Sequence, residues 1–191
     1  MTVLVIGLIV FLGIHSISIF APDFRNRMAA RIGAGPWRGV YALISLVGFA
    51  LIVWGYGLAR REPVVLYNPP FWTRHLTVVL MLPVFPLFFA PYFPGRIKAA
   101  LKHPMLVAVK LWAVAHLISN GMLADVLLFG GFLAWAVADR ISYKHRQLRP
   151  LKGAPPAARN DVIVVIVGLA IYALFVVWLH LKLIGVQPTP L

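Results

Sequence analysis

Residues 2–20 have the sequence TVLVIGLIVFLGIHSISIF, a stretch without a single charged side chain. A helix rises 1.5 Å per residue, so about 20 apolar residues are needed to cross a hydrocarbon core of about 30 Å. Comparable apolar stretches follow at residues 37–59, 75–92, 104–119, 122–138 and 162–184. We therefore predict an all-α protein, a polytopic transmembrane bundle of about six helices, with residues 1–191 in a single membrane domain.

The composition excludes a soluble domain. Of the 191 residues, 61% are hydrophobic and 12% are charged, and the mean hydropathy is +0.88. A soluble protein of this length needs a far more polar surface. The apolar residues form long blocks instead of one stripe per helix, as expected when the whole circumference meets lipid or other helices. No basic segment precedes the first block, so we expect residues 2–20 to be a retained helix and not a signal peptide.

A net charge of +13 could indicate a protein that binds nucleic acid. The basic residues, however, lie in short clusters between the apolar blocks, as in membrane proteins. We therefore expect membrane lipids with anionic headgroups as partners, and no nucleic acid. Because the chain has no cysteine, iron–sulfur clusters, thiolate zinc sites and covalent haem attachment are excluded.

The positive charges predict an orientation. With the N-terminus outside, thirteen of the 18 lysines and arginines fall in inside segments. Lys110 lies within a predicted span, and the remaining four fall outside: Arg60, Arg61, Arg74 and Lys182. This bias predicts that both termini are outside the cytoplasm, while the loops after the first, third and fifth helices are inside it.

Prolines and a glycine predict local features of the spans. Pro83 and Pro86 lie within the third span, and each removes a backbone donor, so we expect a kink there. Residues 119–121, Ser-Asn-Gly, predict a tight turn between the fourth and fifth helices. A basic, proline-containing loop is expected at residues 139–161.

Ionisable groups inside membrane helices are costly and usually functional. Apart from Arg38 and Lys182, which the orientation count assigns to the flanking segments, these are His15, His75, His103, Lys110, His116, Asp125 and His180. There is no Ser/His/Asp set and no glycine-rich phosphate loop. Histidine dominates, which indicates a neutral metal ligand or a proton carrier.

Two of these histidines suit a shared cofactor. His116 lies on one helix face with Trp112 and Asn120, four residues before and after it. His15 and His116 differ in expected depth by only about 8 Å, an offset that two helices on opposite sides of one porphyrin could accommodate. The alternative for either residue is a buried histidine hydrogen-bonded to a neighbouring helix. His75 and His180 lie near outer helix ends, where an interfacial position explains both.

Lys110 is the most unusual charge in the chain. It follows His103 by seven residues, so both lie on one helix face. Its side chain either extends to the cytoplasmic surface or pairs with Asp125, a haem propionate or a lipid phosphate. Asp125 itself lies in the first turn of its predicted helix, where a carboxylate can act as a cap.

Several segments resemble one known family. Residues 94–121, PGRIKAALKHPMLVAVKLWAVAHLISNG, resemble the NnrU family. The pair His15-Ser16, residues 38–41 (RGVY) and residues 133–140 (LAWAVADR) resemble it as well. The resemblance covers nearly the whole chain.

The resemblance implies a bacterial inner-membrane protein linked with denitrification and nitric oxide metabolism. The family is also related to plant zeta-carotene isomerase, a membrane enzyme that holds non-covalent haem b between two histidines. By this resemblance His15 and His116 are the expected iron ligands, with His103 as a third candidate, either a replacement ligand or a propionate partner. The other expected cofactor contacts are Lys110, Trp112 and Asn120.

These expectations lead to a haem b protein that is isomerase-like or linked to redox and nitric oxide chemistry. Its small-molecule ligand would be a hydrophobic polyene or a gas. One alternative is a non-catalytic accessory or assembly factor without haem, acting on a membrane protein partner. A further alternative is a membrane methyltransferase, because residues 102–104, Lys-His-Pro, resemble the Arg-His-Pro entry of that cofactor site. The paired acidic residues expected near its last helices are absent.

Overall fold

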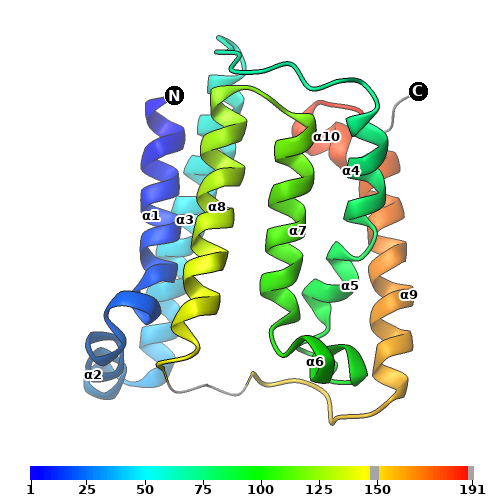
Figure 1. The fold of residues 1–191 in the computed structure, drawn as a ribbon. Helices are drawn as coiled ribbons and strands as arrows, with labels where there is room; N and C mark the ends of the chain where they lie inside the picture. Colours follow the sequence, from blue (N-terminus) through cyan, green and yellow to red (C-terminus); the bar gives the residue numbers. More distant parts are fainter. Residues whose placement is uncertain (147–150, 189–191) are drawn as a thin grey trace. The chain divides into compact units, whose positions relative to one another are not determined.

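The computed structural model describes residues 1–146 and 151–188, and these residues are all-α (Figure 1). Three helical stretches are long and apolar enough to cross a membrane: α1 (Thr2–Phe20), α3 (Ala34–Ala59) and Arg159–Ile184. Shorter apolar helical stretches lie at Thr73–Phe89 and Pro104–Ser119. The predicted fold class, a multi-pass helical membrane protein, is thereby confirmed.

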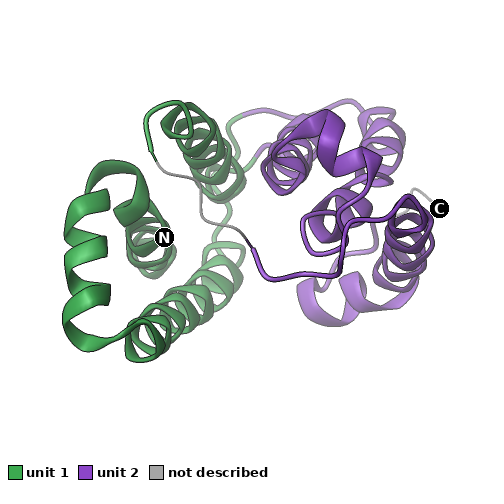
Figure 2. Cartoon of the chain, turned by 90° about the horizontal axis from the view of Figure 1, so that it is seen from below, with its two compact units in different colours: residues 1–66, 122–147 green, residues 67–121, 148–191 purple. Residues whose placement is uncertain are grey.

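The helices belong to two compact units, coloured separately in Figure 2. The first unit comprises Met1–Leu66 and Met122–Gln147, and the second comprises Tyr67–Gly121 and Leu148–Leu191. Each unit is thus assembled from two separate stretches of chain. A single membrane domain over the whole chain stays a prediction.

In the first unit, α1 packs along α3 through glycines. A Cβ atom added at Gly7 or Gly48 would lie 2.6 or 2.7 Å from a backbone nitrogen of the opposite helix. One added at Gly55 would collide with the backbone of Leu4. Small residues allow membrane helices to approach closely and to gain dispersion contacts along their length. The two helices therefore touch at backbone level.

A short helix that the sequence did not predict follows α1. Helix α2 (Pro22–Ile32) has Pro22 in its first turn, where the missing N–H costs nothing. Asp23 in the first turn and Arg31 in the last complement the helix dipole. The helix ends at Gly33, whose φ of +91° disfavours a side chain.

Helix α8 (Leu123–Ser142) completes the first unit and contacts α1. Its N-terminus is capped by Asp125, which is fully buried. The Asp125 carboxylate accepts the Met122 backbone N–H at 3.0 Å and the Tyr56 hydroxyl at 2.6 Å. The predicted capping role of Asp125 is confirmed.

The second unit contains α4 (Thr73–Met81), α5 (Val84–Phe89), α6 (Arg96–Leu101), α7 (Pro104–Ser119), α9 (Arg159–Leu174), the π-helical turn η1 (Phe175–Leu179) and α10 (His180–Ile184). Helix α5 packs against both α7 and α9, and α4 packs against α7. Gly168 of α9 lies directly against the backbone of Pro86. A side chain at residue 168 would therefore separate α9 from α5.

The kink predicted in the third span separates α4 from α5 at Leu82–Pro83. Before it, the Leu82 N–H bonds the carbonyl of Val79 at 3.2 Å, three residues back instead of four. The Val78 carbonyl is thus deprived of its usual helical donor. The hydroxyl of Tyr172 on α9 donates to this carbonyl at 2.8 Å. A neighbouring helix therefore satisfies the backbone group that the kink releases, as membrane proteins require.

Replacing Tyr172 by phenylalanine should lower the free energy of unfolding by about 0.6–1.7 kcal/mol, the range found for hydrogen bonds between membrane helices. Thermal unfolding in a mild detergent measures this loss. Tyr92→Phe is the matched control, since Tyr92 is exposed. Equal melting temperatures for the two variants would contradict the role given to Tyr172.

The loop predicted at residues 139–161 is shorter than expected at both ends. Helix α8 continues to Ser142, and α9 begins at Arg159. Residues 147–150 of this loop lie outside the described residues. Helix α9 starts earlier than predicted because its first turn makes tertiary contacts. The Asp161 carboxylate accepts the backbone N–H groups of Arg96 at 2.8 Å and Ile97 at 3.1 Å. Asp161 thereby caps α6 from a distant part of the sequence.

Candidate functional site

His15 lies on α1 among aromatic side chains from α1, α3 and α8. Its ring stacks on Phe11 with centroids 4.2 Å apart and lies 5.2 Å from the ring of Tyr41. The edge of Trp135 approaches it at 5.9 Å. The spacing of four residues between Phe11 and His15 puts both on one helix face. This half-buried cage is made entirely within the first unit.

The hydrogen bond of His15 fixes which ring nitrogen is available. Nδ1 lies 2.7 Å from the carbonyl oxygen of Phe11, so Nδ1–H is the donor and Nε2 carries the lone pair. An imidazole held in this way by a backbone carbonyl is the arrangement typical of metal-ligating histidines.

Trp135 adds a polar atom to the surroundings of His15. Its indole Nε1 is buried, and it has no hydrogen-bond acceptor among the residues that the structure describes. One turn further along α8, the buried Asp139 pairs with Arg146 at 2.5 Å. A group bound beside His15 would therefore meet aromatic faces and one indole donor.

His116 lies on α7 with the two residues that the sequence placed beside it. Its Nδ1 is 2.8 Å from the Trp112 carbonyl oxygen, and the two rings lie 5.6 Å apart. The backbone and side-chain amides of Asn120 both donate to the His116 carbonyl, each at 2.9 Å. The predicted grouping of these three residues is confirmed, and His116 has the same Nδ1-to-carbonyl bond as His15.

Tyr67 is a residue of this region that the sequence did not predict. Its hydroxyl lies against the carbonyls of Leu117 and Asn120, the latter at 2.8 Å. Its backbone N–H donates to Gly121 at 3.2 Å. Tyr67 therefore closes the C-terminal end of α7 just beyond His116. The one feature of the sequence that hints at this contact is Gly121, because any side chain at residue 121 would collide with the Tyr67 carbonyl.

His103 and Lys110 share α7 with His116 but lie toward its other end. His103 is the N-cap residue, and its N–H bonds the Leu101 carbonyl at 2.6 Å. The thirteen residues to His116 correspond to about 20 Å along the helix. This distance is too long for both imidazoles to reach one iron while α7 is intact, which argues against His103 as a replacement ligand. Lys110 is half-buried between them.

The described residues contain no cluster of three or more histidine, aspartate or glutamate side chains suited to a metal ion. A haem iron needs only axial ligands from the protein, because the porphyrin supplies the other four. His15 belongs to the first unit, and the other five predicted site residues belong to the second. The proximity of His15 and His116 stays a prediction.

Comparison with known proteins gives a match at the family level. A family model described as NnrU protein matches residues 3–188, which is nearly the whole chain. No curated protein and no solved structure matches this chain.

Proposed function

This chain belongs to the NnrU family, a family linked to denitrification gene clusters, and we propose that it binds haem b in the bacterial inner membrane. The proposed axial ligands are His15 and His116. The charge bias of the loops supports an orientation with both termini in the periplasm.

One observation carries the proposal. His15 and His116 each hold Nδ1 against the carbonyl four residues earlier, at 2.7 and 2.8 Å. Each bond sets the Nδ1–H tautomer and directs the lone pair of Nε2 outward from its own helix. A neutral imidazole so oriented is the axial ligand that haem b takes from proteins.

The surroundings of both histidines suit a flat apolar macrocycle. Phe11, Tyr41 and Trp135 surround His15, and Trp112 lies beside His116. Lys110 is the proposed partner for a propionate, because an ammonium group on a long stem can reach a carboxylate while its stem stays in apolar surroundings. The remaining polar contact proposed is Asn120.

Haem b, when bound, supplies a one-electron redox couple and an iron that can bind a diatomic gas or act on a polyene. The link to denitrification favours nitric oxide or electron transfer as the role, with isomerase-like action on a polyene as the second possibility. The part of this chain is to hold the two imidazoles in the correct tautomer and to exclude water with the surrounding aromatic rings.

The test is the absorption spectrum of the protein purified in mild detergent, oxidised and then reduced with dithionite. Wild type should show a Soret band and the sharp reduced bands of low-spin, bis-histidine haem. His15→Ala and His116→Ala should each lose the low-spin bands, because removing either imidazole leaves the iron with at most one protein ligand.

His180→Ala is the matched control for this test. The Nδ1 of His180 also lies 2.7 Å from a carbonyl, that of the exposed Val186, but His180 is not among the proposed haem contacts. Its substitution should leave the spectrum unchanged. A wild-type protein that stays colourless after haem addition would overturn the proposal and leave a haem-free accessory role in its place.

A further inference from the structure

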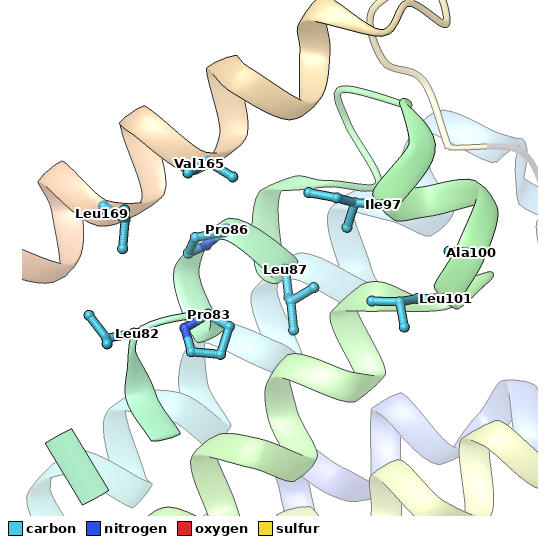
Figure 3. A pocket seen from close by; sticks show the side chains of 9 residues that line it. All are labelled: Leu82, Pro83, Pro86, Leu87, Ile97, Ala100, Leu101, Val165 and Leu169. Carbon is cyan, nitrogen blue, oxygen red and sulfur yellow. The ribbon is translucent and has the colours of Figure 1, made fainter. Parts of the chain in front are cut away.

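An open apolar groove lies within the second unit between α5, α6 and α9 (Figure 3). Its volume is about 620 Å³, within the range of ligand sites. All of its lining residues are apolar, and the residues that define its walls are Pro86, Leu87, Ile97, Leu101, Val165 and Leu169. A polar ligand would find no hydrogen-bonding side chain inside it.

Helix α6 forms one wall of the groove and is amphipathic. Ile97, Ala100 and Leu101 line the groove at the spacing of one helix face. The charged residues of the same segment are Arg96 and Lys102, which are exposed, and Lys98, whose ammonium donates to the Pro91 carbonyl at 3.3 Å. A short helix of this kind suits the boundary between headgroups and acyl chains.

Helix α9 adds a further basic residue at the same end. Asp161, in its first turn, bonds the backbone of α6 at Arg96 and Ile97, so the exposed Arg159 also lies at this end of the groove. We call Arg96, Lys98, Lys102 and Arg159 the basic rim. The Asp161 carboxylate offsets one of the four positive charges of the rim, which leaves a net charge of +3 at this end of the groove.

The length of the groove matches one membrane leaflet. Along α9, the lining residues Val165 and Leu169 lie six and ten residues beyond Arg159. At 1.5 Å per residue, the groove extends about 15 Å from the basic rim. The hydrocarbon core of a bilayer is about 30 Å thick, so this depth reaches its midplane.

The backbone at Lys102, a residue of the basic rim, has an unusual conformation. Lys102 has φ +60° and ψ −46°, and the N–H of His103 bonds back to the Leu101 carbonyl at 2.6 Å. This is a tight turn centred on a conformation that glycine adopts without strain and lysine does not. Strain of this kind is typical of functional positions.

From these observations we propose that the groove binds an anionic glycerophospholipid. One acyl chain lies along Pro86, Leu87 and Leu169, and the phosphate lies on the basic rim. The lipid comes from the leaflet on the α6 side. The basic rim attracts the anionic phosphate, and the apolar groove accommodates an acyl chain. A lipid without net charge would gain only the second of these interactions.

The test uses phosphatidylglycerol with a photoreactive diazirine in one acyl chain, added to the full-length protein in neutral detergent. After illumination, mass spectrometry of peptides should place the label on α5, α6 and α9. Phosphatidylcholine with the same chain should label these helices at least about 30-fold less, because it carries no net charge for any of the four rim residues to attract. This comparison needs no variant.

A pair of double variants tests the basic rim directly. Arg96→Gln with Lys102→Gln should reduce labelling by phosphatidylglycerol by roughly 30-fold, from the loss of two basic residues at the membrane surface. Arg27→Gln with Arg31→Gln removes the same charge from exposed positions of α2 and should change labelling little. Equal labelling by both lipids, or labels outside the three helices, would overturn the proposal. The groove would then be a lipid-facing surface without preference for an anionic headgroup.

Discussion

Replacing Gly55 by leucine should destabilise the protein by about 3 kcal/mol or more, the upper end of the cost of overpacking. A Cβ at Gly55 collides with the backbone of Leu4, and backbone atoms cannot rotate away as a side-chain tip can. Helices α1 and α3 would have to separate along their common face. For a chain of this size the loss corresponds to a fall in melting temperature of about 6–12 °C. Thermal unfolding in detergent, followed by circular dichroism, measures it.

Gly57→Leu is the matched control, because it makes the same change two residues further along α3. No atom lies within 4 Å of a Cβ added at Gly57, which is exposed. Leucine is also a better helix former than glycine, so this variant should be as stable as wild type or slightly more stable. If the two variants had the same melting temperature, the close contact between α1 and α3 would be refuted.

Asp125→Ala should cost about 2–6 kcal/mol, because it leaves two partly buried donors without acceptors at about 1–3 kcal/mol each. The donors are the Tyr56 hydroxyl and the Met122 N–H, which bond the carboxylate at 2.6 and 3.0 Å. Since Asp125 is fully buried, water cannot replace the lost oxygens without entering the helix packing. The measurement is again the melting temperature in detergent.

Asp23→Ala provides the control for Asp125. Asp23 also lies in the first turn of a helix, α2, but it is exposed, so its loss should cost no more than about 0.3–1 kcal/mol. Combining Asp125→Ala with Tyr56→Phe should recover part of the stability, because the orphaned hydroxyl is removed together with its acceptor. Strictly additive losses would refute the contact between α3 and α8.

The parts of the fold that the sequence predicted depend on local signals. Apolar length identified α1 and α3, Pro83 identified the break after α4, and residues 119–121 identified the end of α7. Helix α2 was missed because its polar composition resembles a loop. The start of α9 was misplaced because Asn160 and Asp161 are polar, and only their contacts with residues 94–97 reveal why they are helical.

For the candidate site, helical periodicity predicted which residues lie together on one helix, but it could not predict contacts between helices. The grouping of Trp112, His116 and Asn120 follows from spacing by four residues. Tyr41 and Trp135 come from α3 and α8, so no pattern along the chain could place them against His15. The hydrogen bonds that fix the imidazole tautomers could not be predicted from the sequence. Every helical histidine has a carbonyl four residues earlier, but only the orientation of the side chain decides whether Nδ1 bonds to it.

The assembly of each unit from two separate stretches of chain imposes an order on biosynthesis. Helices α1 and α3 emerge from the ribosome first and can dock on each other at once. Their third partner, α8, follows only after Tyr67–Gly121 has been made, a delay of roughly 3–11 s at 5–20 residues per second. During that interval the Asp125 carboxylate that bonds Tyr56 has not been made, and the face of α1 that contacts α8 is without its partner. The insertion machinery therefore handles a half-built first unit while the second one is still entering the membrane.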